Sequence, residues 1–160
     1  MRPEPENRLT QRAVKAWRIS ELFRSIIFWI PVFVLWLISL EGNGPASWII
    51  YTVAAFALVF SILSISLIPK IRWLRWHYQI DQHEIDLMHG VFIIRRTLVP
   101  VNRVQHVDTR QGPILRKFGL ADVTISTAAT THEIPALDSE TADRVRNQIS
   151  NFARLSKEDV

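Results

Sequence analysis

The sequence predicts a two-helix transmembrane hairpin followed by an α+β domain that is mostly antiparallel β and has one C-terminal helix. Two observations support this fold class. The 160-residue chain has no acidic or basic residue between Gly42 and Pro69, although 21% of its residues are charged. After Arg75 the apolar residues begin to alternate with polar ones, as they do in half-buried strands. One membrane anchor and one modest domain fit this length.

The first apolar segment, from Ser25 to Leu40, is marginal in length for a membrane span. It reaches across the bilayer if it begins near Phe23 and Arg24 extends its charge toward the headgroups. Pro31 lies within two turns of the helix start, and membrane helices tolerate proline better than soluble ones. We therefore expect the first transmembrane helix over about 23–40.

The second apolar segment, from Trp48 to Ile68, is the stronger membrane span. It carries no charge over 21 residues. Large apolar side chains cover all of its faces, which is unusual for a helix buried in a soluble core. We expect the second helix over about 48–68, so that residues 25–69 form the hairpin.

The charges around the two spans predict their orientation. Basic residues precede the first span and follow the second, whereas the connecting loop, residues 41–47, has none. By the positive-inside rule, both termini lie in the cytoplasm and the chain is a multi-pass protein of the cytoplasmic membrane. A cleaved signal peptide with Ala46 near its end is the alternative for the first span, and it leaves the residues after 70 in the cytoplasm as well.

Residues 1–24 form a basic cytoplasmic segment in this scheme. Their apolar residues are scattered among charged ones. This pattern fits either a short helix at the membrane interface or a solvated tail whose arginines set the topology.

The cytoplasmic domain at residues 70–160 is predicted from alternation and from turn residues. Pro135 places the last strand at a sheet edge or shortens it. A helix of about 16 residues follows, capped by Asp138 or Ser139. Together these elements predict a bent antiparallel sheet, or a partly open barrel, plugged by the helix. Strands are expected at 78–80, 85–87, 91–99, 107–109, 121–127 and 132–137.

Three features of this domain carry a resemblance to a known family. They are Gly90, the segment Pro100-Val-Asn-Arg-Val-Gln-His106 and the segment Gln111-Gly-Pro-Ile-Leu-Arg-Lys-Phe-Gly-Leu-Ala121. With the order of elements, they resemble the membrane-anchored bacterial pleckstrin-homology-like (PH-like) domain family of the YdbS type. The resemblance covers residues 70–155, and family members place two membrane helices before the domain.

The resemblance implies a PH-like fold and little biochemistry, because PH-like folds bind lipids, peptides or other proteins. The turn Asp81-Gln82-His83-Glu84 also lacks the basic motif that phosphoinositide-binding relatives carry across their first hairpin. Inositol-phosphate recognition is therefore not implied. The family-motif residues with expected structural roles are Gly90, Pro100, Gly112, Pro113 and Gly119.

No catalytic, metal or cofactor site is predicted. His83-Glu84 begins like a zinc-protease motif, but leucine occupies position 87, where the second histidine is required. His132 beside Glu133 lacks an accompanying nucleophile. The absence of cysteine excludes disulfides and thiolate metal sites.

Six basic residues fall on adjacent predicted strands and on the short turn that follows them. In a domain tethered below a bilayer, they form either a solvated face or a contact for anionic lipid or a partner. They are Arg95, Arg96, Arg103, Arg110, Arg116 and Lys117.

From these features we predict a non-enzymatic PH-like interaction module that presents its cytoplasmic domain to membrane protein partners or to a second copy. The alternative is peripheral recognition of anionic lipid headgroups by the basic residues. Nucleic acid is not an expected partner, because the basic residues near the N-terminus flank a span. Transport is not expected either, because the spans contain no ionisable residue after Arg24.

Overall fold

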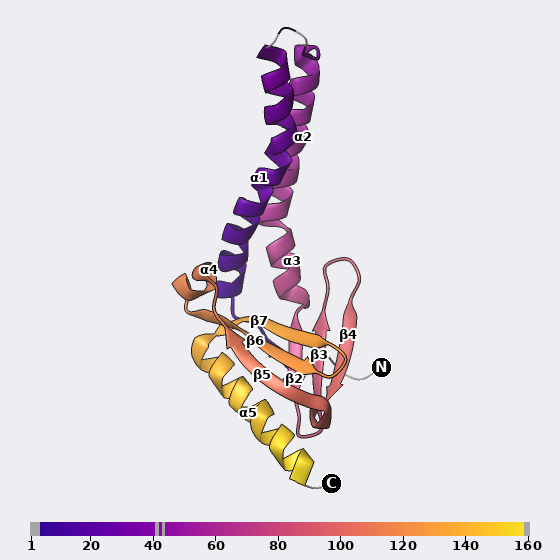
Figure 1. Cartoon of the computed structure of the whole chain (residues 1–160), viewed down its shortest axis with the longest axis vertical. Coiled ribbons are helices and arrows are strands. Elements are labelled where there is room, and N and C mark those ends of the chain that lie inside the picture. Colours follow the sequence, from indigo (N-terminus) through magenta and orange to yellow (C-terminus); the bar gives the residue numbers. More distant parts are fainter. Residues whose placement is uncertain (1–3, 41, 43, 159–160) are drawn as a thin grey trace. The chain divides into compact units, whose positions relative to one another are not determined.

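The computed structural model describes residues 4–40, 42 and 44–158 of the chain. It divides into two compact units. One comprises the chain up to Ala16 together with Ile71 onward, and the other comprises Trp17–Lys70. The described strands all belong to the first unit, which we call the β unit, and the second is helical (Figure 1).

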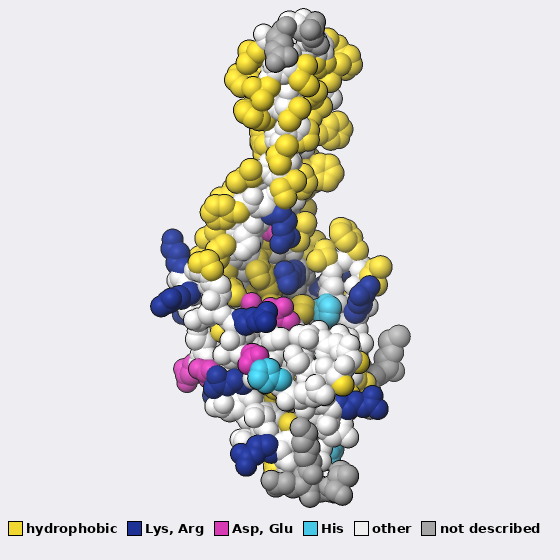
Figure 2. Space-filling view, in the orientation of Figure 1, with side chains coloured by type: hydrophobic (Ala, Val, Ile, Leu, Met, Phe, Trp, Pro, Cys, Tyr) yellow, Lys and Arg dark blue, Asp and Glu magenta, His cyan; other side chains and the backbone are white. Residues whose placement is uncertain are grey.

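Among the residues that the structure describes, two helices are long and apolar enough to cross a membrane. They are α1, Arg12–Leu40, and α2, Ser47–Ser66, which is followed by the short helix α3, Ile68–Arg75. Helix α1 begins well before the expected residue 23, because no glycine or proline interrupts residues 12–30. Large apolar side chains cover the outer surface of both long helices, as lipid-facing helices require (Figure 2).

The helical unit packs through aromatic and small side chains. The rings of Phe28 on α1 and Phe60 on α2 have centroids 5.9 Å apart. Ala57 and Ser61 are buried, which is typical of the small residues that let membrane helices approach closely. The Ser61 hydroxyl donates to the Ala57 carbonyl at 2.7 Å, so its donor is satisfied within its own helix.

The first sheet of the β unit has four antiparallel strands in the order β1-β2-β3-β4. Strand β1, Asn7–Arg8, comes from the N-terminal segment, for which we expected a helix or a tail. Two residues are too short for an alternation pattern, and β1 exists because Asn7 pairs with Tyr78 on β2. Strand β4 begins at Arg95 and not at Val91, so residues 91–94 lie outside the sheet. The remaining strands are β2, His77–Ile80, β3, Glu84–His89, and β4, Arg95–Pro100.

The second sheet has three antiparallel strands in the order β5-β6-β7. The 3₁₀ turn η1, Val101–Arg103, joins β4 to β5, and helix α4, Pro113–Lys117, joins β5 to β6. The expected bent sheet or partly open barrel is therefore built from two separate sheets. The strands are β5, Val104–Arg110, β6, Leu120–Thr127, and β7, Thr131–Asp138.

Strand β7 lies at an edge of the second sheet, as Pro135 predicted. Beside this proline the pairing with β6 shifts register between Ala121 and Val123. Ala136 adopts a positive φ of 53° there, and its N–H donates to the Asp122 carboxylate at 2.7 Å. The irregularity thus keeps a backbone donor paired where proline interrupts the ladder.

The C-terminal helix α5, Ser139–Glu158, packs on β5, β6, β7 and η1. Its buried face carries Ala142, Val145, Ile149 and Ala153, which recur at helical spacing. Both the N–H and the hydroxyl of Ser139 donate to the Gly119 carbonyl, at 3.0 and 2.9 Å, and fix the helix start. Side chains of both sheets complete the core, with full burial of Ile85, Leu87, Leu120, Ile125 and Ile134.

Candidate interaction surface

The six basic residues predicted to contact lipid or a partner lie in three places on the β unit. Arg95 and Arg96 begin β4, whereas Arg103 ends η1 beyond the other end of that strand. Six residues of strand separate these positions by about 20 Å. The third group comprises Arg110 at the end of β5 with Arg116 and Lys117 on α4, and all three are exposed.

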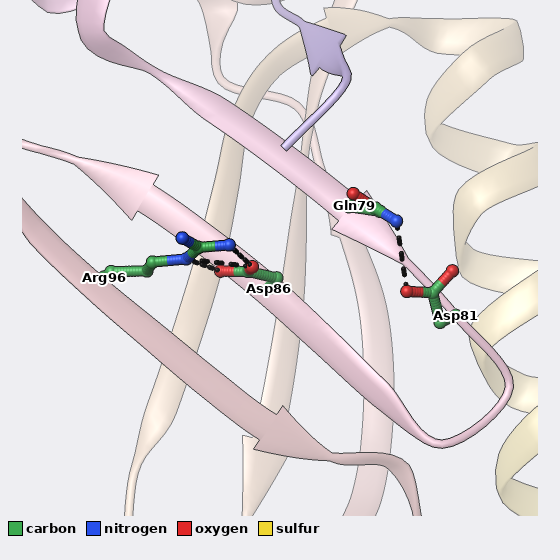
Figure 3. Close-up of polar contacts among 4 residues, drawn as sticks. All are labelled: Gln79, Asp81, Asp86 and Arg96. Carbon is green, nitrogen blue, oxygen red and sulfur yellow. Dashed lines mark hydrogen bonds and ion pairs between the residues drawn. The ribbon is translucent and has the colours of Figure 1, made fainter. Parts of the chain in front are cut away.

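Arg96 is engaged within the first sheet (Figure 3). Its Nε lies 3.1 and 3.0 Å from the two carboxylate oxygens of Asp86 on β3. Asp86 is 7% exposed, so the ion pair supplies the countercharge of a nearly buried carboxylate. Arg96 therefore stabilises the first sheet through its ion pair with Asp86, in addition to any contact it makes at the surface.

The turn between β2 and β3 is acidic and hydrogen-bonded. The Asp81 N–H donates to the Glu84 carbonyl at 3.0 Å and closes the turn. The Gln79 side-chain amide donates to the Asp81 carboxylate at 3.1 Å (Figure 3). With no lysine or arginine from Asp81 to Glu84, this turn lacks the permanent cations that bind a phosphate group.

The family-motif residues around α4 adopt the conformations that their types favour. Gly112 precedes the helix, and Pro113 occupies its first turn, where a missing N–H costs nothing. Gly119 has φ +66° and ends the turn after α4. Arg116 and Lys117 are thereby held outward on a short, fixed helix.

Two carboxyl groups of the second sheet lie together. Partial burial of Glu133, followed by the charge of Asp122 and a hydrogen bond to it, raises the pKa of Glu133. Arg72 and Arg110 oppose this shift. When both carboxyl groups are ionised they repel each other, and the nearby arginines offset part of this repulsion.

His89 at the end of β3 stacks on Trp76, with ring centroids 4.5 Å apart. Burial lowers the pKa of His89, and the charges of Arg72, Arg95 and His132 lower it further. The neutral ring is thus favoured beside these cations. Among the described residues, no group of three or more His, Cys, Asp or Glu side chains is arranged to hold a metal ion.

An open groove of about 600 Å³ runs along the end of β4. Strand β4 is an edge strand, and no described strand pairs with its outer side. Leu98 is exposed there, and Arg103 lies on the rim. The groove offers an apolar floor, a strand edge and one cation to a ligand. Its lining comprises residues 98–100, 102–105, 127–130 and His132.

The tip of the β3–β4 hairpin is a feature that the sequence analysis missed. Residues 91–94 were expected to belong to a strand, yet they form a loop in which Val91 is half-buried and the apolar side chains of residues 92–94 are exposed. Gly90 precedes the loop with φ +142°. The signal available in the sequence was an apolar run without polar alternation, bounded by a glycine and two arginines.

Comparison with known proteins agrees with this architecture. The profile described as "Bacterial PH domain" matches residues 25–153. The chain belongs to the bacterial PH domain family. The matched region takes in most of the helical hairpin and most of the β unit, without β1 and the end of α5. The expected PH-like fold, with two apolar helices first and one helix last, is therefore confirmed.

Two relatives from Bacillus subtilis (strain 168) extend the family relationship. The chain is 44% identical to the UPF0699 transmembrane protein YdbS over 160 residues, which is the whole of both chains. It is 26% identical to the UPF0699 transmembrane protein YdbT over 99 residues, covering 58% of this chain and 20% of that protein. No solved structure matches the chain significantly.

Proposed function

We propose that this bacterial PH domain protein is a membrane-anchored, non-enzymatic interaction module. Its β unit binds an extended segment of a membrane protein partner, or of a second copy of the chain, in the groove beside β4. The observation that carries the proposal is the coincidence of an open groove with the outer edge of strand β4. Edge strands bind extended peptides through main-chain hydrogen bonds, while pockets beside them select side chains.

The helical hairpin supports this role by holding the β unit at one membrane. Basic residues flank the hairpin at both ends, and its loop has none, so we place both termini in the cytoplasm. Anchoring raises the effective concentration of the domain near membrane partners. A weak groove contact then suffices for binding.

Site-specific photo-crosslinking in native membranes tests the groove. A photoreactive residue replaces Ala129, which is exposed on the groove lining, and a matched control replaces Gln148, which is exposed on α5 outside it. We expect an adduct from position 129 alone. Coexpression of two differently tagged copies tells a second copy from another protein. Equal adducts at both positions, or none at 129, contradict the proposal.

The orientation is tested separately by cysteine labelling, because the chain has no native cysteine. Ser150→Cys on α5 should react with an impermeant maleimide only in inside-out vesicles. Ala46→Cys, just before α2, should react only in intact cells or spheroplasts. The reverse pattern overturns the cytoplasmic placement without bearing on the groove.

A second candidate function is recognition of anionic headgroups, and it is favoured by the exposed group Arg110, Arg116 and Lys117. Each cation close to an anionic surface contributes about 1 kcal/mol. Backbone amides of α4 should shift in nanodiscs that contain phosphatidylglycerol and not in zwitterionic ones. The double variant Arg116→Gln/Lys117→Gln should abolish this difference, and shifts that ignore lipid charge contradict the idea.

A further inference from the structure

The β3–β4 loop exposes three consecutive large apolar side chains. Phe92 is 91% exposed, Ile93 74% and Ile94 55%. Scattered surface apolar residues are ordinary, but a contiguous group at the tip of a hairpin marks a contact surface. Hydrophobic side chains gather at this tip in the space-filling view, above a basic side chain (Figure 2).

The loop has a fixed shape. A Cβ on Gly90 would lie 1.9 Å from the Ile93 carbonyl oxygen, so the chain folds tightly back on itself there. The Arg75 guanidinium donates a hydrogen bond to the Val91 carbonyl. The apolar tip therefore lies on a turn of defined conformation, and Arg75 at the end of α3 contacts one side of that turn (Figure 1).

The contact with Arg75 ties the loop to a residue that is close in sequence to the second span. The second uncharged run ends at Pro69, and Arg75 follows six helical residues later, about 9 Å along the chain at 1.5 Å per residue. The headgroup region of one leaflet has a similar thickness, about 5–8 Å. A loop bound to Arg75 thus lies within reach of the membrane interface.

The charges beside the loop have the sign that an anionic bilayer surface attracts. Arg72 and Arg75 lie on the part of α3 that belongs to the β unit, and Arg95 follows the loop and is exposed. Neither residues 68–75 nor residues 90–100 contain an acidic side chain. An apolar tip flanked by basic residues is the arrangement by which interfacial segments bind bilayers.

We propose that the apolar tip Phe92–Ile94 inserts into the interface of the inner leaflet and forms a third membrane contact of the chain, besides its two spans. The partner is the lipid surface. The groove beside β4 begins at the opposite end of that strand, so insertion of the tip leaves the groove facing the cytoplasm. This inference does not depend on the proposed groove function.

Fluorescence quenching in the full-length chain tests the insertion. Ile93→Cys and, separately, Phe92→Cys are labelled with a nitrobenzoxadiazole probe and reconstituted in phosphatidylcholine–phosphatidylglycerol vesicles. Gln148→Cys, exposed on α5 outside the groove, provides the solvent control, and Ile62→Cys in α2 provides the membrane control. A nitroxide placed high on the lipid acyl chain should quench positions 92 and 93 about twofold more than position 148. Aqueous iodide should show the reverse order.

Two outcomes overturn the proposal. If positions 92 and 93 behave like position 148 toward both quenchers, the tip lies in water. If they are shielded from iodide without being quenched by the lipid nitroxide, protein covers them, from a second copy or another partner. Retained quenching at Ile62→Cys shows in either case that reconstitution succeeded.

Discussion

Arg96 on β4 forms an ion pair with the carboxylate of Asp86 on β3, with Nε 3.1 and 3.0 Å from the two carboxylate oxygens. The two residues do not face each other in register, since Arg96 pairs with Met88 and Asp86 with Leu98. The guanidinium therefore reaches diagonally across the strands. One of the six cations considered for surface contact is thus part of the sheet's own polar network.

Replacing Arg96 by methionine should destabilise the β unit. The nearly buried Asp86 then loses its countercharge, and an unpaired buried carboxylate costs more than the ion pair contributes. We expect the midpoint of thermal unfolding, followed by near-UV circular dichroism in detergent, to fall by several degrees. Arg95→Met is the matched control, because Arg95 is exposed on the same strand. Equal effects of the two variants contradict this view of Arg96.

The Glu133–Asp122 pair predicts a carboxyl-dependent change of stability with pH. The pKa of Glu133 is raised above its ordinary value of 4.5, so the folded chain holds this proton more tightly than the unfolded chain. Its stabilising contribution is present below pH 4.5 and is lost as pH rises through the folded pKa. At pH 7, Glu133→Gln should therefore be more stable than the parent, by less than about 1 kcal/mol because the site is partly solvated.

The stability gain of Glu133→Gln should disappear in denaturation experiments below pH 4.5, where Glu133 is protonated in both the folded and the unfolded chain. Glu140→Gln is the contrasting control. Glu140 lies in the first turn of α5, where a negative charge favours the helix dipole. Removing the negative charge of Glu140 should lower the stability of the chain at pH 7. A Glu133→Gln variant that is less stable than the parent at pH 7 argues against strain in the pair.

His89 predicts a second and opposite pH dependence. Burial and the charges of Arg72, Arg95 and His132 lower its pKa from 6.5. A lowered histidine pKa stabilises the folded state above pH 6.5, and this stabilisation is lost as pH falls through the folded pKa, because the unfolded chain takes up the proton first. Titration of the His89 ring resonances by NMR in micelles should give a midpoint below 6.5, the ordinary histidine value. A midpoint at or above 6.5 contradicts the prediction.

Gly90 is required by the conformation of the β3–β4 loop. Gly90→Ala places a Cβ 1.9 Å from the Ile93 carbonyl at φ +142°, a backbone region that alanine rarely adopts. We expect a loss of about 1–3 kcal/mol in unfolding free energy. Gly112→Ala is the control, since nothing lies within 4 Å of its added Cβ and its φ is −73°. Similar losses in both variants, measured by chemical denaturation, contradict the requirement.

Several elements could be predicted because their signals are local. Pro135 predicted an edge strand, since proline cannot donate to a second neighbour, and β7 lies at an edge. The apolar spacing through Val145 and Ile149 predicted α5. Strand β1 could not be predicted, because two residues carry no pattern and their pairing partner lies about 70 positions away in sequence.

The candidate surfaces were likewise predictable from the sequence only in part. Each of the six basic residues was visible in the sequence, but their separation into three groups depends on the direction of β4 and β5. The exposed tip Phe92–Ile94 was taken for strand, because an apolar run fits a buried strand as well as a loop. Only the fold around Gly90 and the contact between Arg75 and Val91 place these side chains outside the sheet.

The sequence by itself determined the two apolar helices, the family and the order of strands before a final helix, since each depends on composition or short-range periodicity. The tertiary structure decided which strand is left unpaired at its outer edge, where the groove lies and which apolar residues face outward. These depend on contacts between residues far apart in the chain, and no local pattern encodes such contacts.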